Sequence, residues 1–227
     1  MEMEATRILI NSSPRSGHAW LQFILAHYKG NNSNIDLGDI GGDQFIVRAN
    51  TPIMLLASFK DITQTIILRN PTQLIPSIVT KTMGGLGQTV TSGVAMPHEY
   101  NNLPSLDALI DEQFNVFRRY AIGIEENIER LKPFTFEQVT EDISFVVKEL
   151  LGYDIPNSDI PELIELSKKR IRQHNKGDVA YNNAVPVDKK PDIYYEIQQK
   201  VLSAPRLAKS LELYETTKSL ILESQNK

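Results

Sequence analysis

A short polar turn close to the start of the chain carries the residues best suited to hold an anion. It spans Asn11 to Gly17, reads NSSPRSG, and contains the permanently charged Arg15. Backbone N–H groups at the start of a helix point into such a turn and stabilise an anion, and an arginine adds a fixed positive charge. We interpret the turn as an oxyanion site, for a phosphate or a sulfate group. A plain strand-to-helix turn with a surface arginine is the alternative on this stretch alone.

The residues on either side of the turn predict a strand before it and a helix after it. Ile8 to Ile10 is a short apolar run with β-branched residues, which is typical of a buried strand. Trp20 to Leu25 has the apolar density of a helix that packs on a sheet. The GxxxxGK[ST] pattern of a nucleotide-triphosphate loop is absent, because no lysine follows Gly17 and no Ser or Thr stands where magnesium would be held. The turn is therefore suited to an anion that binds without a metal.

Strand and helix patterns alternate over the next part of the chain. Further strands are predicted over Gln44 to Ala49 and over Gln64 to Arg69. Pro52 and Pro71 follow these strands and suit the first turn of a helix. The alternation is typical of a three-layer α/β/α fold with a central parallel sheet, and such sheets bind ligands at the carboxyl ends of their strands.

The rest of the chain is predicted to hold one long loop, a fourth strand and mainly helices. Lys81 to Pro104 has four glycines and little apolar periodicity, which indicates a functional lid or a disordered segment. The segment PFTFEQV, 133–139, is interpreted as the fourth strand. Helices are predicted over 105–131, 141–153, 160–172, 191–202 and 207–222, so the C-terminal part is helical.

Composition limits the classes of protein to which the chain can belong. Its 227 residues, 41% hydrophobic and 23% charged, are ordinary for one globular domain, 1–227. The net charge of −4 gives no general attraction to nucleic acid, and the lack of cysteine excludes disulfides and thiolate chemistry. No apolar run reaches ~18 residues, and the acidic N-terminus does not resemble a signal peptide. We expect a soluble, cytoplasmic protein with no membrane or nucleic-acid partner, and the oligomeric state is left open.

Two segments resemble the donor-binding motifs of the sulfotransferase superfamily. PRSGHAWL, Pro14 to Leu21, is similar to the family's 5′-phosphosulfate loop, P-[KR]-[ST]-G-[ST]-[ST]-W-L. IILRNPTQLIPS, Ile66 to Ser77, is similar to its 3′-phosphate motif, in which R-[ND]-P is followed by a serine eight residues after the arginine. A third segment, PFTFEQVTEDISFVVKELLGY, resembles the family's YEDL strand and the helix after it. The resemblance covers about Arg7 to Tyr153 and implies a P-loop-like α/β fold.

The resemblance implies a donor and the residues that bind it. The donor is 3′-phosphoadenosine 5′-phosphosulfate (PAPS), whose two anionic ends need two separate sites, and no metal is implied. Arg69 and Ser77 would hold the 3′-phosphate, since arginine makes planar, bidentate contacts and stays charged. Trp20 would lie beside the adenine, with a core aromatic as the alternative. The loop that would hold the 5′-phosphosulfate consists of Pro14, Arg15, Ser16, Gly17, His18, Ala19 and Trp20.

The same resemblance identifies catalytic residues only in part. Arg15 would stabilise the bridging oxygen and the 5′-phosphate by electrostatics, because arginine keeps its proton. Arg48 fits the basic position of the family's Lys-x-His arrangement, but Asn50 stands where the catalytic histidine would be. His18 is therefore the first candidate for the general base, since histidine has an unperturbed pKa that suits acid–base work near neutrality. The alternatives are Asp43, His98 and Glu99.

Other positions depart from the family pattern. Phe136 stands where a tyrosine is common, on the adenine side of the donor. HNKGDVAY, with Lys176 and Gly177, is the nearest match to the family's C-terminal R-K-G-x-x-G-D-W motif and a further candidate for donor contacts. The acceptor pocket would lie in variable loops, here about Gly30 to Asp43 and Lys81 to Pro104.

The predicted function is transfer of a sulfuryl group from PAPS to a hydroxyl or amine of a small-molecule or glycan acceptor. A non-catalytic protein that binds PAPS or its product is the first alternative, because of Asn50. A metal-dependent nucleotide kinase of the P-loop type is the second, and the missing GK[ST] pattern counts against it.

Overall fold

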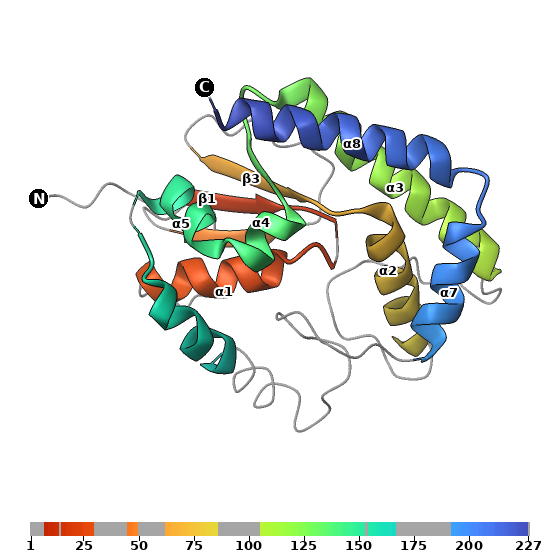
Figure 1. The fold of residues 1–227 in the computed structure, drawn as a ribbon, viewed down its shortest axis with the longest axis horizontal. Helices are drawn as coiled ribbons and strands as arrows, with labels where there is room; N and C mark the ends of the chain where they lie inside the picture. The colour runs from red at the N-terminus through yellow and green to blue at the C-terminus, as the bar shows by residue number, and fades with distance from the viewer. Residues whose placement is uncertain are drawn as a thin grey trace, which may run out of the picture.

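The computed structural model describes residues 7–13, 15–29, 45–49, 62–85, 105–152, 154–166 and 192–226 (Figure 1). Its strands are β1 (Arg7–Asn11), β2 (Phe45–Ala49), β3 (Thr63–Leu68) and β4 (Lys132–Thr135). Its helices are α1 (His18–Lys29), α2 (Pro71–Gly85), α3 (Leu106–Asn127), α4 (Phe136–Glu141), α5 (Ile143–Leu151), α7 (Asp192–Leu202) and α8 (Leu207–Ser224). A 3-10 turn covers Asn157–Asp159, and residues 160–166 are also helical. The described chain is thus mostly helical around a small sheet, which confirms the α/β class.

The described strands form one parallel sheet in the order β2–β1–β3–β4. The inner strand β1 pairs with β2, where Asn11 lies opposite Ala49, and with β3 on its other side. β3 pairs in turn with β4, where Leu68 lies opposite Thr135. Since these strands all run in one direction, the residues that follow them emerge at the same edge of the sheet.

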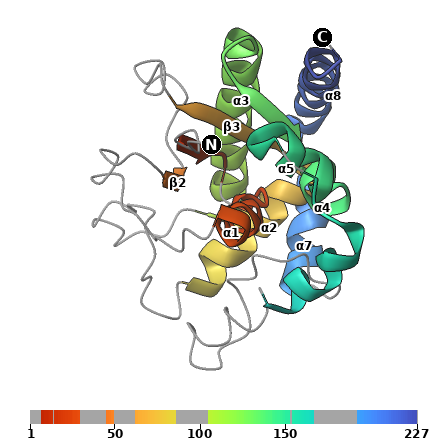
Figure 2. The same ribbon diagram turned by 90° about the vertical axis from the view of Figure 1, so that its left-hand side faces the viewer.

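Helices cover both faces of this sheet, so the described chain has three layers (Figure 2). Neighbouring residues of a strand point to opposite faces. Ile67 of β3 therefore joins the core against α1 and α5, whereas Ile66 and Leu68 join the core against α3 and α8. A third cluster lies between α2, α3 and α7 and includes Ile75 and Ile197. Burial on both faces explains why β1 and β3 contain unbroken apolar runs.

Helix α2 begins where the sequence RNP predicts. The Asn70 side chain accepts hydrogen bonds from Thr72 N and Thr72 Oγ1, at 2.9 and 2.7 Å, and Pro71 occupies the first turn, where no N–H is needed. Pro76 lies inside the helix and has no N–H to donate to the Thr72 carbonyl four residues earlier. The Gln198 side chain of α7 donates to that carbonyl instead, at 3.4 Å. This bond fixes the position of α7 along α2.

The fourth strand is shorter than the sequence predicts. We expected a strand over 133–139, but β4 ends at Thr135 and α4 begins at Phe136. The Thr135 side chain accepts from Gln138 N, and the Gln138 side chain accepts from Thr135 N, which together form a capping box. Because these bonds satisfy the first N–H groups of α4, the apolar residues after Thr135 are helical.

The other described helices agree with the predictions, with shifts at their ends. The Ser105 side chain caps the start of α3. α5 ends at Leu151 and is capped by Gly152, whose φ of 78° suits glycine. α2 continues to Gly85, so the loop predicted from Lys81 begins later than expected. The rest of that loop, the predicted helix after Pro52 and residues 167–191 lie outside the described part of the chain.

Candidate functional site

Three chain segments meet at the carboxyl edge of the sheet and form the candidate site. The turn after β1 contains Ser12 to Gly17, Arg69 follows β3, and Phe136 follows β4. From β1 the chain passes to β2 on one side, whereas β3 lies on the other side of β1. The connections after β1 and β3 therefore diverge, and such a switch point is where open parallel sheets bind ligands. Both predicted phosphate motifs lie at this switch point.

The turn after β1 has a backbone shape that suits an anion. Arg15 and Gly17 have positive φ values of 68° and 84°, and Ser16 N donates to Ser13 O at 3.3 Å. Left-handed residues in such a turn direct successive N–H groups toward one point. A left-handed conformation costs a residue other than glycine about 1–2 kcal/mol. Arg69 stabilises it here, because its Nη1 donates to Arg15 O at 2.5 Å.

Two serine hydroxyls of the turn are buried without a hydrogen-bond partner among the described residues. Ser12 and Ser16 are both 0% exposed. The Oγ atom of each is buried and has no hydrogen-bond partner among the described residues. A buried hydroxyl left unsatisfied costs about 1–3 kcal/mol. An oxyanion in the turn offers acceptors to such hydroxyls, so these two atoms are direct structural support for a ligand there.

Arg69 is a buried cation between the turn and Phe136. The residue is 8% exposed, and its guanidinium lies 4.0 Å from the centre of the Phe136 ring. No described carboxylate forms an ion pair with it, and its Nε has no hydrogen-bond partner among the described residues. The pKa of Arg69 is lowered to about 10, mainly by burial and also by the nearby charge of Arg15. Tyr194 and Glu137 raise this pKa and so oppose the effect of burial. A bound anion would offset the cost of holding this charge.

Arg15 connects the two motifs directly. Its Nε donates to Ser77 Oγ at 3.3 Å, although the two residues are 62 positions apart in the sequence. Ser77 is 5% exposed and lies on α2, about two helical turns beyond Arg69. Burial also lowers the pKa of Arg15. Two guanidinium groups and a buried hydroxyl thus line one small region, which suits the oxygens of a phosphate or a sulfate.

Phe136 forms a wall beside the turn. A Cβ atom placed on Gly17 would lie 3.4 Å from Cδ2 and Cε2 of Phe136 and 3.5 Å from Cγ1 of Val139. The glycine thus allows the turn to approach α4 closely while it keeps its positive φ. Phe136 lies against Gly17 and under Arg69, and the start of α4 brings it to this position.

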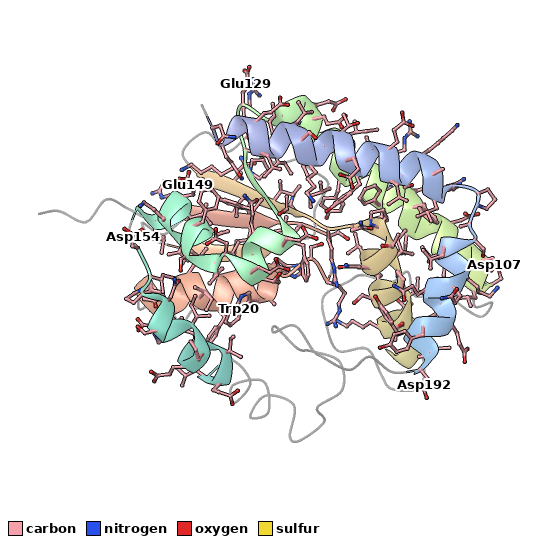
Figure 3. All side chains as sticks on the ribbon, in the orientation of Figure 1. Trp20, Asp107, Glu129, Glu149, Asp154 and Asp192 are labelled. Atoms are coloured by element: carbon pink, nitrogen blue, oxygen red, sulfur yellow. The ribbon has the colours of Figure 1, made fainter. Side chains whose placement is uncertain are left out.

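The remaining residues of the predicted loop lie in the first turn of α1. His18 is the first residue of the helix and is partly buried, as is Ala19. Trp20, on α1 (Figure 3), is 3% exposed and packs in the core between α1 and the sheet. Its ring stacks on that of Phe23, with ring centroids 6.0 Å apart. The structure therefore favours the core role for Trp20, and its contact with adenine remains a prediction.

Several predicted site residues cannot be positioned against this cluster. The side chain of Arg48 lies outside the described part of the chain, although its backbone pairs with Ile10 in β2. The same holds for Pro14, Asp43, Asn50, His98, Glu99, Lys176 and Gly177, whose backbones are not described either. His18 is therefore the one candidate base among the described residues, and its role remains a prediction.

Two residues that were not predicted as site residues act on Arg69. Glu137 follows Phe136 on α4, and its carboxylate accepts a hydrogen bond from the Tyr214 hydroxyl of α8. Tyr194 comes from α7, far along the chain. Both raise the pKa of Arg69 against the effect of burial. Glu137 lies within the third resembling segment, beside Phe136, so its position there is the signal that could have identified it. No local pattern identifies Tyr194, because only the packing of a distant helix brings it to the arginine.

A metal site, a membrane-spanning helix and a ligand-binding groove each place requirements on the described residues. These residues contain no group of three or more His, Cys, Asp or Glu that could hold a metal ion. None of the described helices has both the length and the apolar character to cross a membrane. A groove of about 770 Å³ lies between α3 and α8, but none of the motif residues lines it. Arg206 lines this groove and already forms an ion pair with Asp111, with 3.6 Å between Nε and Oδ1. The carboxyl edge of the sheet, where the two motifs meet, is therefore the candidate site.

Comparison with known proteins does not assign the chain to a family. No protein-family model matches it, and no curated protein is significantly similar to it. The function is therefore inferred from the residues of the site and from their geometry.

Proposed function

We propose that the chain is a sulfotransferase of the P-loop-like type, which moves a sulfuryl group from PAPS to a hydroxyl or amine of a small-molecule or glycan acceptor. One observation carries the proposal: the two motifs meet, because Arg15 donates to Ser77 and Arg69 donates to the Arg15 carbonyl. PAPS has a phosphosulfate and a separate 3′-phosphate. A buried and a partly buried arginine from two loops suit such a molecule. The resemblance of both loops to sulfotransferase motifs supplies the identity of the donor.

Each anionic end of the proposed donor has its own residues. The turn from Ser12 to Gly17 holds the 5′-phosphosulfate with its N–H groups and its buried hydroxyls. Arg69 and Ser77 hold the 3′-phosphate, whose charge offsets that of the buried guanidinium. Phe136 lies beside both groups and offers an apolar surface to the nucleoside between the two ends.

The proposed transfer is an in-line displacement at sulfur. The acceptor oxygen or nitrogen forms a bond to sulfur while the bond from sulfur to the bridging oxygen breaks, and the electron pair stays on the leaving 5′-phosphate. Arg15 stabilises that charge without giving up a proton, because a guanidinium keeps its proton at neutral pH. His18, at the end of the turn, accepts the proton from the acceptor group.

A donor-binding protein without catalysis is the second candidate. Asn50 stands where the resembled family carries its catalytic histidine, and an amide cannot accept the proton. Incubation with PAPS and a panel of phenols, amines and oligosaccharides distinguishes the two candidates. Acceptor-dependent release of adenosine 3′,5′-bisphosphate, lost in Arg15→Ala, indicates the enzyme, whereas tight binding without any release indicates the binding protein.

Binding of adenosine 3′,5′-bisphosphate tests the site that both candidates share. A ligand specific for the native state stabilises it by RT ln(1 + [L]/Kd), so the bisphosphate should raise the melting temperature by about 5–10 °C at a concentration of 100 Kd. EDTA should leave this shift intact, and 5′-AMP should give a smaller one. Magnesium should not increase the shift produced by ATP. The absence of any shift at millimolar bisphosphate would overturn the proposal.

A further inference from the structure

Helix α7 lies side by side with α2, the helix that carries Ser77 (Figure 1). The two helices run in opposite directions. α2 leads away from the carboxyl end of β3, whereas α7 begins at Asp192, beside the far end of α2 (Figure 3). Tyr194, Ile197 and Val201 are the buried residues of α7, and their helical spacing places them on the face that packs against its neighbours.

A hydrogen bond sets the register of these two helices. Gln198 Nε2 donates to Thr72 O, the carbonyl that Pro76 leaves without its helical donor. In an antiparallel pair, a residue one turn before Gln198 lies level with a residue one turn after Thr72. Tyr194 therefore lies at the level of Pro76 and Ser77, on the buried face of α7.

The phenol of Tyr194 also interacts electrostatically with Arg69. Tyr194 is 6% exposed, and burial raises its pKa while the charge of Arg69 lowers it. The next residue, Tyr195, is 49% exposed and meets the Tyr194 ring edge-on, with centroids 5.5 Å apart. Two neighbouring tyrosines on one helix thus have opposite environments. Of the two, only Tyr194 lies on the buried face of α7 and is affected by the charge of Arg69.

We propose that Tyr194 is a third binding residue for the anion held by Arg69 and Ser77, so that α7 belongs to the donor site. The inference rests on the proposed function, which identifies this anion as the 3′-phosphate of the donor. A phosphate monoester has three oxygens and accepts more hydrogen bonds than one guanidinium and one hydroxyl supply. A buried phenol adds a donor without adding charge, which suits a position beside two arginines that already repel each other.

Two tyrosine substitutions in the full-length chain test the proposal. Tyr194→Phe and Tyr195→Phe each remove one hydroxyl and keep the ring, and titration calorimetry at neutral pH measures binding of adenosine 3′,5′-bisphosphate and of 5′-AMP. Tyr194→Phe should weaken the bisphosphate about 10- to 100-fold, the effect of one hydrogen bond to a charged group. It should leave 5′-AMP unchanged, because 5′-AMP has no 3′-phosphate. Tyr195→Phe should change neither affinity, since that side chain faces solvent.

The possible outcomes separate this inference from the proposed function. Unchanged bisphosphate affinity in a folded Tyr194→Phe variant would overturn the inference, and so would an equal loss for both nucleotides, which indicates a structural role. A wild-type protein with no preference for the bisphosphate over 5′-AMP would overturn the proposed function as well.

If Tyr194→Phe does not fold, Gln198→Ala tests the same geometry, because it releases α7 from the Thr72 carbonyl. This variant should weaken the bisphosphate selectively, and unchanged affinity would count against the role of α7.

Discussion

The substitution Arg69→Met removes the buried guanidinium of the candidate site and keeps a side chain of similar length. In the proposed site this guanidinium binds the 3′-phosphate, and in the unliganded protein it holds the Arg15 carbonyl and lies over Phe136. The substitution therefore acts on recognition and on stability, and the two effects can be measured separately. We expect a large loss of bisphosphate affinity and a small change in the free energy of unfolding.

The stability expectation follows from opposing contributions. Burial lowers the pKa of Arg69 from 12.5 to about 10, which corresponds to about 3 kcal/mol of cost for holding the charge at neutral pH. Methionine removes this cost, but it also removes the hydrogen bond to Arg15 O and the contact with the Phe136 ring. These contribute about 1.5–3 and about 0.5–2 kcal/mol. The free energy of unfolding should therefore change by less than about 2 kcal/mol.

The binding expectation follows from the burial of the charge. Removing one partner of a buried charge pair costs about 2–5 kcal/mol, so the bisphosphate should bind roughly 30- to 5000-fold more weakly. The nucleotide 5′-AMP lacks the 3′-phosphate and loses only the support that Arg69 gives to the Arg15 carbonyl. We expect that loss to stay below about tenfold, or ~1.4 kcal/mol.

Titration calorimetry with both nucleotides and urea unfolding measure the two effects. Arg119→Met is the matched control, because it makes the same chemical change at a side chain that is 65% exposed and pairs with Glu112 on the surface. Such a pair contributes about 0–1 kcal/mol, and neither nucleotide should bind differently. Equal weakening of both nucleotides by Arg69→Met, with its circular dichroism unchanged, would refute the assignment of this arginine to the 3′-phosphate. A stability loss above about 4 kcal/mol would show instead that the guanidinium is mainly structural.

Two further predictions concern the turn and a buried tyrosine. Gly17→Ala and Gly152→Ala each add a methyl group at a positive φ and should each lower the free energy of unfolding by about 1–2 kcal/mol. Only Gly17→Ala should also weaken the bisphosphate in a titration, because only Gly17 lies in the site, and equal affinities of the two variants would contradict this. Burial raises the pKa of Tyr120 to about 12, so the folded protein keeps a proton that the unfolded chain loses near pH 10, and stability falls as the pH rises between these values. Urea unfolding of Tyr120→Phe should show a smaller loss of stability between these pH values. The absorbance titration of this variant should also lack the late tyrosinate step at high pH. An unaltered absorbance titration would show that another tyrosine titrates there.

By itself, the sequence determined the local elements around the site. The apolar run at Ile8 to Ile10 and the Asn70–Pro71 pair predict a buried strand and a helix start, and the structure contains both. These features depend on side-chain patterns and caps within a few residues, which short-range physical chemistry controls. The end of β4 was also encoded locally, in Thr135 and Gln138, but the apolar, β-favouring residues around this capping box suggested a longer strand.

Only the tertiary structure decided which of these groups meet. The strand order places the turn after β1 beside the end of β3, so that Arg15 reaches Ser77 and Arg69 reaches the Arg15 carbonyl. It also buried Trp20 in the core, where the sequence allowed a ligand contact, and it brought Tyr194 of α7 to Arg69. Such contacts join residues far apart in the sequence. They depend on how whole helices pack on the sheet and on each other, which no local backbone preference specifies.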